Sequence, residues 1–272
     1  MSDVIEFRPK TGASDVIETP THQVITHVLQ ECHSRGQLGI VRGGFGVGKS
    51  HALGHYVAGR ECDAAMVTFS PSTRSLTAGL GAVCRAVGQL WEWHFSQPAP
   101  ISTYTTGSAH AARLALERFC RAIAEEGGRV LLVLDEAQHA RLDLLEELRA
   151  IHDMKACACG LVIAGNESLF NAQRGRMEAA AYGALLSRAH HVIDRPTPKP
   201  EDIAAVLEAH RIKGAEARKL LAQHAAAGGL RKVFQIIQKA REISGGSPPS
   251  LLQVKAAAAS TGLTATGWGR TR

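Results

Sequence analysis

The chain has 272 residues, of which 45% are hydrophobic, 21% charged and 5% aromatic. This length and composition exclude a disordered tail or a disulfide-stapled mini-protein, and they predict one or two domains with a core of small aliphatic side chains. The formal net charge of +6 permits a polyanionic partner without requiring one. The six cysteines follow no metal-site spacing, so we expect reduced, mostly buried thiols.

The N-terminal residues, MSDVIEFRPK, are acidic where a signal peptide needs a basic start and an apolar run. No stretch approaches the length of about 18 apolar residues that would span a membrane. We therefore expect a cytoplasmic protein with no membrane partner. Residues 1–20 lack periodicity and are expected to form a flexible N-terminal arm, and residues 264–272 a flexible tail.

From residue 21 onward, apolar strand patterns alternate with helical patterns, which is typical of a parallel sheet with helices on both faces. Beyond these alternating elements, the sequence pattern predicts helices alone. The fold class is α/β, with a nucleotide-binding core over residues 21–197 and a small helical lid domain over residues 198–263. The predicted strands are residues 39–42, 64–70, 129–136, 160–165 and 190–195. The predicted helices run from residue 21 to Gly36, from 50 to 60, from Pro71 to about Trp93, and over 108–126, 142–154, 201–209, 215–227, 230–243 and 251–260.

The first predicted strand leads into a glycine loop that fits the pattern G-x-x-x-x-G-K-[ST] and precedes a predicted helix. Glycines let the backbone N–H groups turn toward phosphate oxygens, and the helix N-terminus adds partial positive charge. Lys49 would reach the β- and γ-phosphates of ATP, and Ser50 would hold Mg²⁺. The expected nucleotide-binding residues are Gly43, Gly44, Phe45, Gly46, Val47, Gly48, Lys49, Ser50 and His51.

Two carboxylates end the most apolar strand, in the run Leu131 to Glu136. Asp135 would hold Mg²⁺ through water, and Glu136 would polarise the attacking water as a general base. Asn166 directly follows the strand over residues 160–165, where its amide would lie near the γ-phosphate. A Gly-Asn pair fits a simple turn equally well, and this alternative stays open.

These motifs together resemble the AAA+ ATPases, with a Walker A loop, a Walker B strand and a sensor 1 asparagine. The resemblance implies two further functional residues. Arg188, just before the last predicted strand, would be an arginine finger that reaches a neighbouring subunit, and Arg231, at the start of a lid helix, would be the sensor 2 arginine. Guanidinium groups at these places neutralise charge on the transferred phosphoryl group.

Within that superfamily the chain looks most like the transposition-helper branch, the target-selection ATPases of the phage Mu B, TniB and TnsC type. The resemblance implies ATP-dependent assembly as a ring or helical filament on double-stranded DNA, and delivery of that DNA to a transposase. The phage Mu member also carries an N-terminal helix-turn-helix domain. Because few residues precede Thr21, we expect the ATPase core itself to bind DNA. Candidate DNA contacts, which would grip phosphates without reading bases, are Thr73, Arg74 and Thr106.

Two alternative functions remain at this point. A replication initiator or helicase loader would have a similar AAA+ core, although such proteins usually carry an additional winged-helix or partner-docking domain. An AAA+ scaffold or secretion ATPase would act on a protein partner, and duplex DNA would then not stimulate its ATPase activity.

Overall fold

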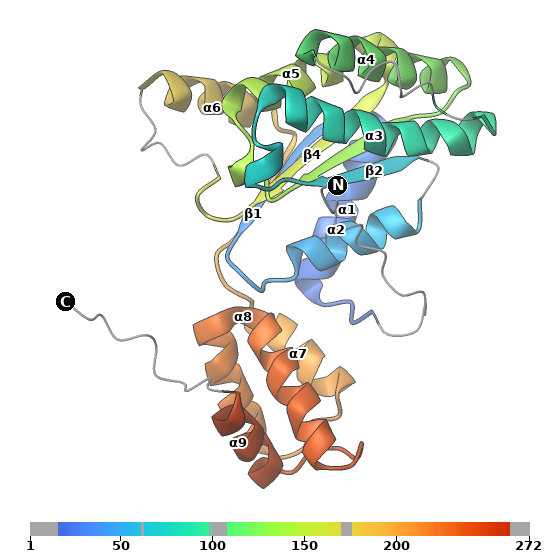
Figure 1. Cartoon of the computed structure of the whole chain (residues 1–272). Coiled ribbons are helices and arrows are strands. Elements are labelled where there is room, and N and C mark those ends of the chain that lie inside the picture. Colours follow the sequence, from blue (N-terminus) through green and yellow to red (C-terminus); the bar gives the residue numbers. More distant parts are fainter. Residues whose placement is uncertain (1–15, 61–62, 98, 100–107, 170–175, 262–272) are drawn as a thin grey trace. The chain divides into compact units, whose positions relative to one another are not determined.

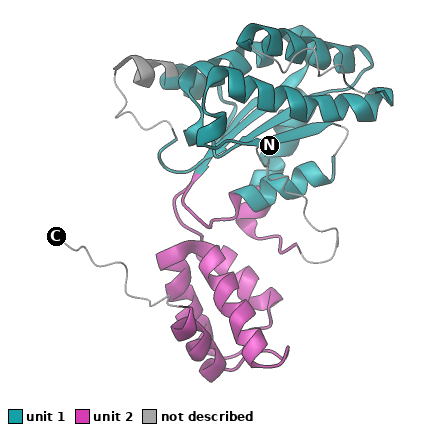
Figure 2. Ribbon diagram, viewed as in Figure 1, with its two compact units in different colours: residues 1–11, 25–42, 50–194 teal, residues 12–24, 43–49, 195–272 magenta. Residues whose placement is uncertain are grey.

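The structure is a computed structural model that describes residues 16–60, 63–97, 99, 108–169 and 176–261, with only the backbone of residues 176–181. It divides into two compact units (Figure 2). The first unit comprises residues 1–11, 25–42 and 50–194, and the second comprises residues 12–24, 43–49 and 195–272. The glycine loop therefore belongs to the same unit as the C-terminal helices.

A five-stranded sheet forms the centre of the first unit, with the strand order β2-β3-β4-β1-β5. The β1–β4, β2–β3 and β3–β4 pairs are parallel. This arrangement confirms the expected α/β fold class with a parallel five-stranded sheet. The strands are β1 (Leu38–Gly43), β2 (Ala64–Thr68), β3 (Val130–Asp135), β4 (Cys159–Gly165) and β5 (His191–Arg195).

Both faces of this sheet are buried, which explains why its central strands are aliphatic throughout. In β3, Leu132 and Leu134 pack into one hydrophobic cluster, while Leu131 and Val133 pack into the other. Helices α3, α4, α5 and α6 cover the first face, and α1 and α2 cover the second (Figure 1). The helices are α1 (Pro20–Arg35), α2 (Lys49–Ala58), α3 (Leu76–Phe95), α4 (Ala109–Glu125), α5 (Leu142–His152) and α6 (Arg176–Arg188).

Two local features of this unit differ from the sequence prediction. A 3-10 turn, η1 (Pro71–Thr73), follows β2, and α3 begins only at Leu76 because Ser75 caps it by accepting the Ala78 N–H. No helix was predicted over α6, whose apolar spacing is weak. Tertiary packing decides this segment, since Tyr182 and Leu185 are buried in the core cluster.

The second unit contains α7 (Pro200–Ala209), α8 (Ala215–Ile243) and α9 (Leu251–Ser260), which share a hydrophobic core of their own. Helix α8 is interrupted at Gly228 and Gly229, whose backbone angles are not helical. This interruption confirms the prediction of two helices at that place. In the ranges that the structure describes, every helix is too short or too polar to cross a lipid bilayer.

Candidate nucleotide-binding site

The glycine loop between β1 and α2 is curled by positive φ angles of 73° at Gly46 and 98° at Gly48. Glycine adopts this region without steric cost, so these positions suit the motif. A Cβ atom added at Gly48 would meet no atom within 4 Å, so open space adjoins the loop there. Phe45 is 73% exposed at the loop, whereas Val47 is buried beneath it. The loop thus has the curled, glycine-rich backbone of the kind that binds phosphate oxygens.

Lys49 folds back over this loop. Its Nζ donates hydrogen bonds to the carbonyl oxygens of Gly43 at 2.7 Å and Gly44 at 2.9 Å. The side chain is buried, with 8% exposure, so its charge is held at the loop and not in bulk solvent. An ammonium group held by neutral carbonyls can exchange them for phosphate oxygens, which offer a stronger, charge-assisted hydrogen bond.

Within the second unit, the loop is anchored at two points by backbone contacts. Gly44 donates its N–H to Arg195 O at 3.0 Å, and Gly46 O accepts the N–H of Leu230 at 2.8 Å. A Cβ atom at Gly229 would lie 2.5 Å from Phe45 O, so only glycine permits this approach. The kink of α8 is therefore packed directly on the glycine loop. Arg231 is exposed, and it directly follows Leu230, which donates the hydrogen bond to Gly46 O.

In the first unit, the carboxyl ends of β3, β4 and β1 lie along one edge of the sheet. Asp135 is 2% exposed, and its Oδ1 accepts the backbone N–H of Glu136 at 2.9 Å. Its backbone oxygen also accepts the N–H of Phe69 at 2.9 Å, which ties the end of β2 to β3. Asp135 therefore ends β3, and Glu136 follows it, at the edge where Asn166 follows β4.

The side-chain oxygen of Asn166 stabilises a local turn, and the amide nitrogen is not used in that turn. Oδ1 accepts the Ser168 N–H at 2.8 Å and the Ser168 hydroxyl at 2.6 Å. Because only the carbonyl oxygen can accept these donors, the NH₂ group of Asn166 must point elsewhere. The turn interpretation and the sensor interpretation are thus compatible, since each uses a different end of the amide.

One residue at this edge was missed by the sequence analysis. The amide of Gln138 lies between two predicted site residues, with Nε2 donating to the Glu136 carboxylate and Oε1 accepting the Asn166 N–H. Spacing alone does not show that Gln138 reaches a second strand, because that contact depends on the β3–β4 pairing.

Oxygen donors at the site fit Mg²⁺. Ser50 supplies a hydroxyl and Asp135 a carboxylate, and Mg²⁺ commonly binds through one or two such groups together with substrate phosphates and water. The described residues contain no group of three or more His, Cys, Asp or Glu side chains suited to a metal. The hydroxyl of Ser50 and the carboxylate of Asp135 fit a cation that substrate phosphates and water also bind. His51 lies in the first turn of α2 and is exposed.

Arg188 ends α6 and is half-exposed, with a side-chain exposure of 51%. Its Nε lies 4.0 Å from Oδ2 of Asp153. A surface ion pair of this length contributes little stability, so the guanidinium is held only weakly within the subunit.

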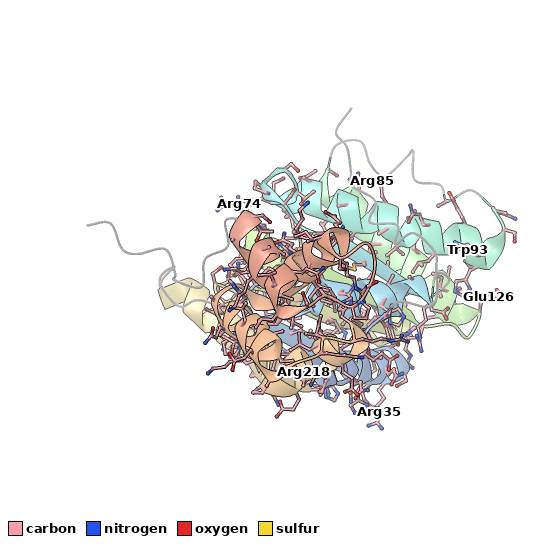
Figure 3. All side chains as sticks on the ribbon, turned by 90° about the horizontal axis from the view of Figure 1, so that it is seen from below. Arg35, Arg74, Arg85, Trp93, Glu126 and Arg218 are labelled. Atoms are coloured by element: carbon pink, nitrogen blue, oxygen red, sulfur yellow. The ribbon has the colours of Figure 1, made fainter. Side chains whose placement is uncertain are left out.

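The candidate DNA contacts lie partly in a groove of about 620 Å³ between the β2–α3 loop and the start of α5. Arg74 and Arg141 both line this groove, and the Arg141 N–H donates to Arg74 O at 3.4 Å. Figure 3 shows Arg74 at the surface of the unit. Thr73 is used locally, since its Oγ1 accepts the Ser70 N–H at 2.9 Å. Thr106 lies outside the described residues.

The parallel sheet, the glycine loop after β1 and the acidic end of β3 define the P-loop class of nucleotide-binding folds. Residues 31–172, more than half of the chain, match a family model described as an AAA domain, and the chain belongs to this family. Among solved structures, the ORC2 protein of Aeropyrum pernix has a TM-score of 0.61 at 13% identity, covering 94% of this chain and 70% of that chain. This likeness concerns the fold.

The similar proteins include one named as a target DNA activator and one named as a DNA transposition protein. The chain is 26% identical over 218 residues to the ATP-dependent target DNA activator B of Escherichia phage Mu, covering 80% of this chain and 63% of that protein. It is 27% identical over 227 residues to the Mu-like prophage FluMu DNA transposition protein B of Haemophilus influenzae, covering 83% of this chain and 72% of that protein. The resemblance to the transposition-helper branch is confirmed. The match spans less than two thirds of the phage Mu protein's length.

Proposed function

We propose that this chain binds ATP with Mg²⁺ and hydrolyses it to ADP and phosphate. The observation that carries this proposal is the glycine loop, which curls at Gly46 and Gly48 and holds the Lys49 ammonium on its own carbonyls. Its backbone N–H groups and Lys49 would bind the β- and γ-phosphates. We assign nucleotide contacts to the whole loop and to the first residues of α2, Ser50 and His51.

Hydrolysis then requires a base and a means of orienting water. The Glu136 carboxylate would accept a proton from the attacking water as its oxygen bonds to the γ-phosphorus and the bond to the β-phosphate oxygen breaks. The NH₂ group of Asn166 would orient that water or a γ-phosphate oxygen. Ser50 and Asp135 would hold Mg²⁺, which supplies positive charge against the phosphate oxygens.

Two arginines would link hydrolysis to domain and subunit contacts. Arg231 follows the Leu230 N–H that binds the glycine loop, so it would sense the nucleotide from the helical lid, which we take as residues 198–263. Arg188 is half-exposed, and its ion pair with the described residue Asp153 is long, which suits a finger that enters a neighbouring subunit's site.

We also propose that ATP-bound subunits assemble as a ring or helical filament on double-stranded DNA and direct a transposase to target sites. The similarity to a protein named target DNA activator supports this part of the proposal. The groove that holds Arg74 and Arg141 adds a second support, since guanidinium groups bind backbone phosphates without reading bases. In an assembly, the modest +6 charge of each subunit would repeat and create a basic surface.

The test is retention of duplex DNA by wild type, Lys49→Ala and Glu136→Gln, each with ATP, with ADP and without nucleotide, at rising salt. Wild type should retain DNA only with ATP, Glu136→Gln should retain it persistently because hydrolysis is blocked, and Lys49→Ala should not retain it. Retention that is independent of ATP in both wild type and Lys49→Ala would refute the proposed mechanism.

A measurement of ATPase activity with and without duplex DNA separates this proposal from a protein-directed scaffold. We expect duplex DNA of any sequence to stimulate hydrolysis, because assembly on DNA would bring Arg188 of one subunit to the site of the next. This coupling would be contradicted if wild-type protein retained DNA with ATP but no duplex DNA stimulated its ATPase activity.

A further inference from the structure

The side chain of Gln138 connects two strand ends that lie 28 positions apart in the sequence. Gln138 lies in η3 (Ala137–His139), the 3-10 turn that follows β3. Its Nε2 donates to Oε2 of Glu136, and its Oε1 accepts the backbone N–H of Asn166 at 3.1 Å. One planar amide therefore bridges the Walker B carboxylate and the backbone of sensor 1.

The chemistry of the two partners fixes the orientation of this amide. The Asn166 N–H can only donate, so the Gln138 atom that faces it must be the carbonyl oxygen. The NH₂ group then faces an ionised carboxylate, which can only accept. Both contacts are satisfied by one orientation and neither by the reverse, so the bridge has a single arrangement.

The surrounding backbone is built around this bridge. Glu136 has φ 52° and ψ 34°, a left-handed conformation that is uncommon for a residue other than glycine. The conformation turns the chain so that the side chains of residues 136 and 138 meet. On the other strand, a Cβ atom at Gly165 would lie 2.6 Å from Gln138 Oε1, so a glycine is required there to admit the amide.

We infer that Gln138 is a positioning residue, which holds the Glu136 carboxylate in a fixed relation to Asn166 and so sets the geometry of the general base in ATP hydrolysis. The inference rests on the proposed ATPase function and deepens it. The amide occupies Oε2 and restricts rotation of the carboxylate, which directs the other oxygen to the water.

The test compares ATP hydrolysis by wild type, Gln138→Ala and Gln138→Glu, with His139→Ala as a control in the same turn. Gln138→Ala should lower kcat about tenfold or more while the affinity for ATP stays within about twofold, because the contact acts on the base and not on binding. His139→Ala should keep the wild-type kcat.

Gln138→Glu is the sharper variant, because it keeps an acceptor for the Asn166 N–H but replaces the donor to Glu136 by a second carboxylate. Gln138→Glu should therefore lower kcat about as much as Gln138→Ala, with the affinity for ATP again within about twofold, because the donor that holds the Glu136 carboxylate is lost. This nearly isosteric variant keeps the inference testable if Gln138→Ala fails to fold.

The inference would be overturned by a wild-type kcat in both Gln138 variants. It would also be overturned by equal losses of kcat and ATP affinity, since these indicate a structural role alone. Glu136→Gln, measured alongside, distinguishes a failure of the proposed general base from a failure of the positioning role of Gln138. If Glu136→Gln hydrolyses ATP at the wild-type rate, the proposed general base itself is wrong.

Discussion

The buried carboxylate of Asp202 binds Thr21, a residue 181 positions earlier in the chain. Oδ1 accepts the Thr21 backbone N–H at 2.7 Å, and Oδ2 accepts the Thr21 hydroxyl at 2.6 Å. Oδ2 also accepts the Lys199 N–H at 3.0 Å. Asp202 thereby caps the start of α7 and fixes the first turn of α1 within the second unit.

Removal of this carboxylate should destabilise the protein, because it leaves buried donors without an acceptor. We expect Asp202→Ala to lower the free energy of unfolding by about 2–4 kcal/mol, and Thr21→Val by about 1–2 kcal/mol. Thr21→Ser keeps both donors and should stay close to wild type. Urea unfolding of the four proteins measures these differences, and an unchanged midpoint for Asp202→Ala would show that the contact adds no stability.

Substitution of Gly229 should weaken nucleotide binding. An added Cβ would lie 2.5 Å from Phe45 O, and the φ of 70° disfavours any other residue, so Gly229→Ala must shift α8 or the glycine loop. We expect the affinity for ATP to fall about tenfold, as measured by titration with a fluorescent analogue.

Gly245→Ala is the matched control for that experiment. Gly245 has a similar φ of 64°, but an added Cβ would meet no atom within 4 Å. This variant therefore carries the backbone strain without the clash, and its affinity for ATP should equal that of wild type. Equal losses in the two variants would assign the effect to strain and not to the contact with the loop.

Arg188→Ala should bind ATP normally but lose hydrolysis, because the proposed finger acts on a neighbouring subunit's nucleotide. Mixing it with Lys49→Ala subunits should restore part of the activity, since each subunit type supplies what the other lacks. Asp153→Ala removes the 4.0 Å partner of Arg188 and should leave hydrolysis intact. No recovery of turnover at any mixing ratio would argue against action in trans.

Arg74→Ala and Arg141→Ala should each weaken DNA binding and lower its salt dependence. Loss of one phosphate contact reduces the slope of log affinity against log salt by about 1. Arg35→Ala is the control: Arg35 is exposed on α1, pairs with Glu31 at 3.1 Å and lies well away from Arg74 (Figure 3). A uniform change in all three variants would indicate a general charge effect and not binding in the groove.

Stability should fall in mildly acidic solution through His33. Its Nε2 contacts Arg129 O at 3.0 Å and its Nδ1 contacts the Tyr56 hydroxyl at 3.2 Å, and burial lowers the pKa of the ring from its usual value of 6.5. Below pH 6.5 the unfolded chain therefore binds more protons than the folded protein, so the free energy of unfolding decreases as the pH falls.

His33→Gln should flatten this pH dependence, because glutamine does not titrate. His27→Gln, on the exposed side of the same helix, is the control and should keep the wild-type slope. Urea unfolding at pH values from about 5 to 8 measures the slope, which one histidine can change by at most about 1.4 kcal/mol per pH unit. Identical slopes in wild type and His33→Gln would contradict the prediction.

Much of the fold was predictable because many of its strands and helices follow local sequence patterns, such as apolar runs and glycine breaks. The aliphatic run before Asp135 indicated a strand buried on both faces, and the glycine pair at 228 and 229 indicated the break that divides α8. Helix α6 was not predictable in this way, since its short apolar spacing becomes meaningful only when Tyr182 and Leu185 meet a core built by other elements.

The sequence by itself determined the class of chemistry, because the glycine loop and the Asp-Glu pair are contiguous motifs whose backbone and charge requirements are local. Only the tertiary structure decided which distant groups support them. Gln138 meets Asn166 through the β3–β4 pairing, Gly229 meets the glycine loop through the packing of α8, and Asp202 meets Thr21 across most of the chain. The residues in these contacts share no local sequence pattern. The contacts therefore arise only when burial brings the elements together.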